Sequence, residues 1–209
     1  MNKRRKHILQ YVLGGITLGF IILTTGVSIF PNSLLDIEFS EEVQEHNIPF
    51  LNSLMTLVSL PGYMPTSLIM VLVTAALFLL FRYRKEGFFT LLTLLSGLIS
   101  YTAKILVDRP RPSKDLVRVI QTVNSHSFPS GHVLFYVVFF GFLVMVMHHK
   151  KTIPKFLRIL TTVISLFFIF TIPFSRIYLG AHWFTDVLGG FMLGLLALFI
   201  LSYYYLKKA

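Results

Sequence analysis

The sequence predicts an all-α integral membrane protein, built as a bundle of six transmembrane helices. Its 209 residues are 55% hydrophobic and only 13% charged, whereas about 25% of the residues of a soluble domain are charged. Several apolar runs are about 20 residues long, which lets a helix cross a hydrocarbon core about 30 Å thick. The chain has no cysteine, which excludes disulfides, thiol nucleophiles and thiolate metal sites. We expect one domain over residues 1–209.

The first three spans are expected at residues 8–30, 65–81 and 88–107. The apolar part of the first span is longer than that of a signal peptide, and no small-residue cleavage site follows it, so we expect it to be retained. Between the first two spans, residues 49–60 (PFLNSLMTLVSL) have the pattern of a short amphipathic helix on the external membrane interface. The same residues could instead form the start of the second span.

The other spans are expected at residues 131–147, 156–174 and 182–206. Six crossings return the C-terminus to the side of the N-terminus, and basic connections stay on the cytoplasmic side. We therefore expect a multi-pass protein of the cytoplasmic (inner) cell membrane with both termini in the cytoplasm. The basic residues on that side are Lys3, Arg4, Arg5, Lys6, Arg82, Arg84, Lys85, Lys150, Lys151, Lys155, Arg158, Lys207 and Lys208, whereas the first external loop carries Asp36, Glu38, Glu41, Glu42 and Glu45.

The formal net charge of +10 would also suit a nucleic-acid partner, but this topology explains most of it, and no nucleic-acid partner is expected. Six cations lie against the topological pattern, at or near the external side, and an anionic ligand on that side is the simplest explanation. They are Lys104, Arg109, Arg111, Lys114, Arg118 and Arg176.

The first of three polar stretches is KILVDRPRP, residues 104–112. Lys104 lies in the last turns of the third span, and Arg111 follows seven residues later, past Pro110, which ends the helix. A lysine inside a span is costly and indicates function. The alternative is that Lys104 only extends its side chain to the external interface.

The second stretch is PSGH, residues 129–132, at the start of the fourth span. Ser130 is a good N-cap residue, and Gly131 lets a ligand approach the backbone closely. A helix N-terminus also offers free N–H groups to an anion. His132 then lies in the first turn; an ordinary capped helix start is the alternative interpretation.

The third stretch is SRIYLGAHWFTD, residues 175–186. The guanidinium of Arg176 suits phosphate oxygens. His182 and Asp186 are four residues apart and would share one face of a helix. The carboxylate would then bind one imidazole nitrogen and leave the other free to attack. A His–Asp pair that only satisfies its own hydrogen bonds is the alternative.

Spacing brings the three stretches to one membrane face. His132 and Ser175 are separated by 42 residues, which is two crossings of about 20 residues each. The first two stretches are separated by a short external loop. We therefore expect Lys104, Arg111 and Arg176 to lie together with the groups of residues 129–132.

These residues are suited to phosphoryl transfer. Lys104, Arg111, Arg176, Ser130 and the N–H groups near Gly131 would bind a doubly charged tetrahedral oxyanion and stabilise its transition state.

Two histidines divide the remaining chemistry. His182, oriented by Asp186, is the better candidate for the nucleophile, and His132 for the general acid.

The three stretches resemble the type 2 phosphatidic acid phosphatase (PAP2) family, a lipid phosphate phosphatase family that shares its site with vanadium haloperoxidases and glucose-6-phosphatase. The family pattern is Lys, six residues, Arg-Pro; then Pro-Ser-Gly-His; then Ser-Arg, five residues, His, three residues, Asp. The resemblance covers residues 104–186 and implies metal-independent hydrolysis of a lipid phosphate through a phosphohistidine, with no cofactor. The matching residues are Lys104, Arg111, Pro112, Pro129, Ser130, Gly131, His132, Ser175, Arg176, His182 and Asp186.

The substrate is expected to be a membrane lipid with a terminal phosphate at the extracytoplasmic face: undecaprenyl diphosphate, phosphatidylglycerophosphate or phosphatidic acid. The additional cations Arg109, Lys114 and Arg118 favour a headgroup with more than one phosphate or charge. We expect Arg109 to contact lipid headgroups or a second phosphate, and His126 to be a bystander. The sequence does not predict an oligomeric state.

Three other functions use the same residues. Vanadate would fit the same cations, as in a vanadate-dependent haloperoxidase, but membrane embedding argues against it. Intramembrane charges could mark a lipid transporter or flippase, although here they gather at one end of the spans. A zinc hydrolase could use His126, His132, His182 and Asp186, but three cations nearby would repel Zn²⁺.

Overall fold

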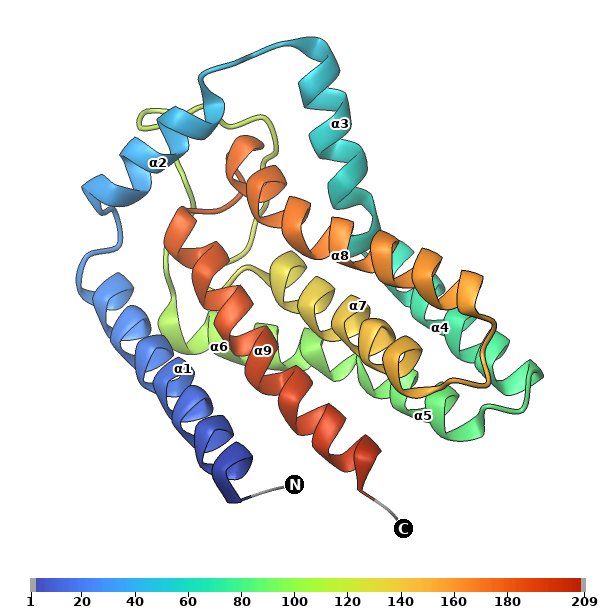
Figure 1. The fold of residues 1–209 in the computed structure, drawn as a ribbon. Coiled ribbons are helices and arrows are strands. Elements are labelled where there is room, and N and C mark those ends of the chain that lie inside the picture. The colour runs from blue at the N-terminus through green and yellow to red at the C-terminus, as the bar shows by residue number, and fades with distance from the viewer. Residues whose placement is uncertain (1–2, 208–209) are drawn as a thin grey trace.

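The computed structural model describes residues 3–207, and the described chain is all-α, as the sequence predicted (Figure 1). Lys208, which we assigned to the basic C-terminal tail, lies outside the described residues. The helices are α1 (Lys3–Ile29), α2 (Leu34–Gln44), α3 (Pro49–Ser59), the 3-10 helix η1 (Leu60–Gly62), α4 (Thr66–Leu80), α5 (Arg84–Leu92), α6 (Leu95–Val107), α7 (Gly131–His149), α8 (Lys155–Tyr178) and α9 (Phe184–Leu206).

Five segments within the described residues are long and apolar enough to cross a membrane: His7–Ile29, Arg84–Val107, Gly131–His149, Lys155–Tyr178 and Phe184–Leu206. The chain is therefore a multi-pass membrane protein.

A sixth span would have to include α4, which has only 15 residues. The segments Pro49–Gly62 and Thr66–Leu80 pass the same test together, but they are bent by 56°. The expected second span is thus a short helix that follows a separate helix over residues 49–59. Both interpretations of residues 49–60 predicted a helix there, and the bend at residues 63–65 separates it from α4.

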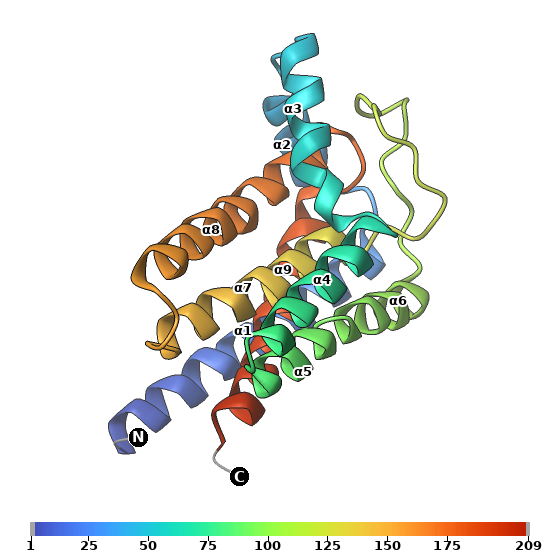
Figure 2. The same cartoon turned by 90° about the vertical axis from the view of Figure 1, so that its right-hand side faces the viewer.

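Helix α7 forms the centre of the bundle, between α8 and α9 (Figures 1 and 2). It is apolar on all sides, with buried residues along its whole length, as expected for a helix surrounded by other helices. Glycines on α9 allow the two backbones to approach: a Cβ on Gly190 would lie 2.6 Å from the carbonyl oxygen of Ser130, and one on Gly194 would lie 2.9 Å from Cβ of Val137. The starts of α7 and α9 are therefore neighbours.

The two ends of the bundle have different roles. The first turn of α1, the last turn of α9 and the turns α4–α5 and α7–α8 lie at one end (Figures 1 and 2). A partly exposed ion pair lies at this end, where the buried Glu86 is 2.8 Å from Nζ of Lys150 and accepts a 2.7 Å hydrogen bond from the Tyr205 hydroxyl. At the other end lie α2, α3, the long loop of residues 108–130 and the α8–α9 turn, which together carry the three motif stretches.

Candidate active site

His182 lies in the turn between α8 and α9. Gly180 adopts a left-handed conformation there (φ +65°), and a Cβ at this position would lie 2.2 Å from the carbonyl oxygen of Arg118. The turn delivers a buried imidazole whose side chain is only 3% exposed. Our expectation that His182 and Asp186 share a helix face was wrong, because α9 begins only at Phe184.

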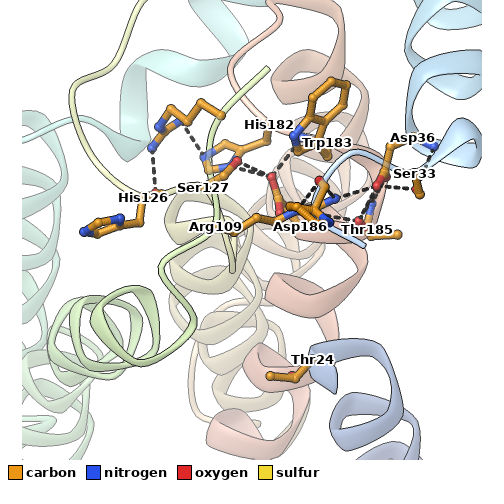
Figure 3. Close-up of polar contacts among 12 residues, drawn as sticks. Thr24, Ser33, Asp36, Arg109, His126, Ser127, His182, Trp183, Thr185 and Asp186 are labelled. Carbon is orange, nitrogen blue, oxygen red and sulfur yellow. Dashed lines mark hydrogen bonds and ion pairs between the residues drawn. The ribbon is translucent and has the colours of Figure 1, made fainter. Parts of the chain in front are cut away.

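The His182–Asp186 contact is instead made by the N-cap of α9. Trp183 is the N-cap residue, and the Asp186 carboxylate folds back to accept its backbone N–H at 2.9 Å. The same oxygen, Oδ2, lies 3.4 Å from Nδ1 of His182 and accepts a hydrogen bond from Ser127. The Trp183 N–H and the Ser127 hydroxyl thus hold this oxygen on the Nδ1 side of the ring, although Nδ1 itself makes no hydrogen bond within the described chain (Figure 3).

Arg109 holds the other oxygen of Asp186, at 2.6 Å from Nη1. The prediction that Arg109 contacts lipid headgroups or a second phosphate was wrong, because its side chain is fully buried. It makes five hydrogen bonds, to Pro31 (twice), Asp36, Thr185 and Asp186. A guanidinium has five N–H donors, so none remains for a substrate.

Lys104 and Arg111 both reach the loop segment of residues 125–127. Lys104 donates to the carbonyl oxygens of His126 and, at 3.2 Å, Ser127. Arg111 donates to Oγ of Ser125 at 3.0 Å and to the carbonyl oxygen of His126 at 3.3 Å. Nη1 of Arg111 lies 3.4 Å from Nε2 of His182. A cation therefore stands beside the ring nitrogen that does not face Asp186.

Arg176 lies in the last turn of α8 and is 1% exposed. Its Nη1 donates to Ser59 and to the Tyr63 hydroxyl, both at 3.0 Å, and to the side-chain carbonyl of Gln121 at 2.9 Å. All three partners are uncharged and come from other elements, namely α3, the bend before α4 and the 108–130 loop. Arg176 is therefore fixed in place without losing its charge to a carboxylate.

The electrostatics follow from these partners. Among the residues that the structure describes, no carboxylate pairs with Lys104, Arg111 or Arg176. Burial and, to a smaller extent, the charge of Arg176 lower the pKa of Arg111 to about 10. Burial also lowers the pKa of His182 well below 6.5, with added effects of Arg111, Lys104 and Arg176. The site is positive, and His182 is neutral at pH 7.

The PSGH stretch forms the start of α7. Ser130 is the N-cap residue, but its Oγ makes no cap hydrogen bond and, within the described chain, has no partner. Its backbone N–H donates to the Asp186 carbonyl oxygen at 2.9 Å. A Cβ on Gly131 would lie 2.9 Å from Oγ of Ser100, so this glycine also permits close packing on α6. Ser130 therefore offers a buried hydroxyl to a ligand.

His132 follows in the first turn of α7. Its ring packs edge-on against Tyr63, with ring centroids 4.7 Å apart, and its Nε2 is buried without a partner among the described residues. The hydroxyl of the same Tyr63 accepts a hydrogen bond from Arg176 at 3.0 Å, so Tyr63 contacts both His132 and Arg176. The structure thus brings together all eight residues that the motifs selected.

Sequence reasoning missed the residues that hold these groups. Asp36 was one acid among five in the first external loop, and Tyr63 and Gln121 carried no motif. Ser127 lies just before the PSGH stretch and could have been noticed as a polar neighbour. Each of them acts through a contact between distant segments, which spacing along the chain does not encode.

Chemically, the arrangement suits a doubly charged tetrahedral oxyanion beside a neutral imidazole. The three cations and the Ser130 hydroxyl can neutralise and bind such an anion. The zinc-hydrolase alternative needs several metal ligands in one place, and within residues 3–207 no three His, Asp or Glu side chains are grouped so that they could hold a metal ion.

Comparison with known proteins agrees with the motifs. The family model described as the PAP2 superfamily matches residues 85–209. The chain is 31% identical to the phosphatidylglycerophosphatase B of Bacillus subtilis over 88% of this chain and 90% of that protein. It is 26% identical to an undecaprenyl-diphosphatase of Sulfolobus acidocaldarius, over 88% and 87% of the two chains. A crystal structure of a transmembrane PAP2-type phosphatidylglycerolphosphate phosphatase from Bacillus subtilis superposes with a TM-score of 0.80, at 25% identity over 95% of this chain and 98% of that one.

Proposed function

The chain belongs to the PAP2 superfamily of membrane lipid phosphatases, and on this premise we propose that it removes the terminal phosphate of a membrane lipid through a phosphohistidine formed on His182. The observation that carries the proposal is the buried imidazole of His182, with Asp186 near one ring nitrogen and Arg111 beside the other. A candidate nucleophile thus lies between a carboxylate that can orient it and a cation that can bind an anion.

In the first step, Nε2 of His182 attacks phosphorus, and the bond from phosphorus to the lipid oxygen breaks. His132 donates the proton that this oxygen needs to leave as an alcohol or as a shortened phosphate. Lys104, Arg111 and Arg176 stabilise the charge on the three non-bridging oxygens. The Asp186 carboxylate stabilises the positive charge that appears on the imidazole ring when its nitrogen is phosphorylated.

In the second step, His132 takes a proton from water, and the water oxygen attacks phosphorus. The phosphorus–nitrogen bond breaks, which releases inorganic phosphate and restores neutral His182. No step in this sequence requires a metal ion, and we expect full activity in the presence of EDTA.

The substrate we propose is undecaprenyl diphosphate, phosphatidylglycerophosphate or phosphatidic acid, hydrolysed at the extracytoplasmic face. The names of the two curated relatives support the first two lipids. The charge distribution supports this orientation. The basic turns α4–α5 and α7–α8 lie at the same end of the bundle as the first turn of α1 and the last turn of α9 (Figure 1), and basic connections stay on the cytoplasmic side.

The test is phosphate release from each of these lipids in detergent micelles. His182→Ala should lower the rate by about 10⁶-fold, to background, and Asp186→Asn by about 10³- to 10⁴-fold, because the wrong imidazole tautomer becomes accessible. His126→Ala, an exposed loop histidine, is the control and should remain active. Near-normal turnover by purified, monodisperse His182→Ala protein would disprove the proposed nucleophile.

A further inference from the structure

We propose that Asp36 is a positioning residue of the active site, which acts through Arg109 and Thr185 to hold Asp186 in the orientation and charge that His182 requires. This inference rests on the proposed function of His182 and Asp186. It assigns a role to the first external segment, because Asp36 precedes the matched family region, residues 85–209.

Asp36 lies in the first turn of α2 and is fully buried. Its Oδ2 lies 2.6 Å from Nη2 of Arg109, and the Ser33 hydroxyl donates to the same oxygen at 2.8 Å. Its Oδ1 accepts the backbone N–H of Thr185 at 2.8 Å and the Thr185 hydroxyl at 2.9 Å. Figure 3 shows that Asp36, Arg109, Thr185 and Asp186 form one connected cluster.

These contacts make Asp36 a cap for α9 that comes from another helix. The backbone N–H of Thr185 belongs to the first turn of α9, where N–H groups have no partner within the helix. A carboxylate is favoured there by the helix dipole. Because Asp186 is the next residue, the Asp36 contact fixes the turn that carries the orienting carboxylate.

The second effect is electrostatic. Two carboxylates, Asp36 and Asp186, share the single guanidinium of Arg109, so the buried cluster carries a formal net charge of −1. Without Asp36, Arg109 would pair with Asp186 alone, and the cluster would be neutral. Phosphorylation of His182 creates a positive charge on its ring, which a net negative neighbour stabilises more than a neutral one does.

The test is rapid-quench measurement of phosphoenzyme formation by the full-length chain in micelles, with ³²P-labelled phosphatidic acid as the probe. Asp36→Asn keeps the size of the side chain and removes its charge. With enzyme in saturating excess over lipid, each lipid reacts once, and we expect the rate constant of phosphoryl transfer to fall about 10- to 100-fold, as when a metal-ligating side chain loses its outer partner. A merely structural role would lower the fraction of active molecules and leave this single-turnover rate constant unaltered.

The matched control is Glu38→Gln, which removes the same charge from an exposed position on the same helix and should phosphorylate at the wild-type rate. A double-mutant cycle with Arg109→Gln tests the route: Asp36→Asn should add little to Arg109→Gln if Asp36 acts through Arg109. Additive effects, or an unchanged rate constant in Asp36→Asn, would overturn the inference.

Thr185→Val covers the case in which Asp36→Asn does not fold. It removes the hydroxyl that joins Asp36 to Arg109 and keeps every charge, and it should lower the same rate constant; an unchanged value would overturn the inference.

His182→Ala separates the two proposals. If that variant turns over substrate, the proposed function is wrong. If it is inactive and Asp36→Asn is phosphorylated at the normal rate, only the role of Asp36 is wrong.

Discussion

His182 is deprotonated by its surroundings. Its side chain is 3% exposed, and burial lowers its pKa well below 6.5, as do the neighbouring cations Arg111, Lys104 and Arg176. In the mechanism that we propose, attack on phosphorus needs the neutral imidazole, so His182 would remain competent at acidic pH values where an ordinary histidine is protonated. The cations that we propose as phosphate ligands thus also favour the neutral form of His182.

Arg111→Gln tests this coupling. Removing the nearest cation should raise the pKa of His182 toward its ordinary value, so kcat/KM should begin to fall at a higher pH than in the wild type as the medium is acidified. The acid limb of the kcat/KM profile reports the pKa values of groups in the free enzyme. The ionisation of the lipid does not contribute to the difference between the two profiles, because both proteins use the same substrate. Lys114→Gln, an exposed cation of the same loop, should leave the profile in place. A limb that stays fixed or moves to lower pH in Arg111→Gln would contradict the coupling.

The motif residues were predictable because phosphate chemistry restricts both their type and their spacing. The family spacing pointed to Arg111 rather than Arg109 as the phosphate ligand, and in the structure Arg109 uses its five N–H donors on protein groups, among them Asp186. Asp36 was not predictable, because it lies 73 positions before Arg109 in the sequence and nothing distinguishes it from the other acids of its segment. A cluster whose members come together only through tertiary contacts produces no recognisable spacing in the sequence.

Among the helices, the bend between α3 and α4 has the most direct effect on the site. It places η1 and Tyr63 against the start of α7, where the Tyr63 ring packs on His132 and its hydroxyl accepts a hydrogen bond from Arg176. Gly62 makes this approach possible, since a Cβ there would lie 2.2 Å from Cδ2 of His132. A straight helix over residues 49–80 would move η1 and Tyr63 away from the start of α7.

Gly62→Ala should therefore displace the His132 ring and lower kcat. A shift of about 1 Å in a reacting group can cost about 100-fold in rate, and we expect a fall of that order in phosphate release. Gly97→Ala is the matched control, because a Cβ at Gly97 meets no atom within 4 Å. Equal rates for the two variants would show that η1 does not position His132.

Hydropathy predicted the long apolar segments because each contains a stretch long enough to cross a membrane, but it did not predict that the third span is divided into α5 and α6. It gives no angle for the bend, which lies near Pro61, Gly62 and Pro65 and next to the hydrogen bond from the Tyr136 hydroxyl to the carbonyl oxygen of Val58. It also placed the start of the last helix two residues early. The N-cap at Trp183 and the returning carboxylate of Asp186 set that boundary, and side-chain hydrogen bonds of this kind do not alter hydropathy.

Across the whole molecule, the two ends of the bundle differ in charge. The end with the turns α4–α5 and α7–α8 carries clustered Lys and Arg, and a hydrogen bond from Lys85 to the backbone of Lys207 ties α5 to the end of α9 there. The end with α2 carries the acids of the first loop. This asymmetry is the basis for the orientation that we propose, with the site outside the cytoplasm.

Cysteine labelling can test that orientation, because the natural chain contains no cysteine. Asn47→Cys, between α2 and α3, and Lys151→Cys, between α7 and α8, would introduce single exposed reporters at opposite ends. In intact spheroplasts a membrane-impermeant maleimide should label Asn47→Cys at once and Lys151→Cys only after permeabilisation. The reverse pattern would place the site on the cytoplasmic side.

The guanidinium of Arg109 joins a carboxylate from near the beginning of the polypeptide to one from near its end. Asp36 is synthesised long before Asp186, so this cluster cannot form until the first turn of α9 has been made and has docked against α2. Under the proposed function, a nascent chain that stops before α9 would therefore release no phosphate from lipid, whatever the state of its earlier helices.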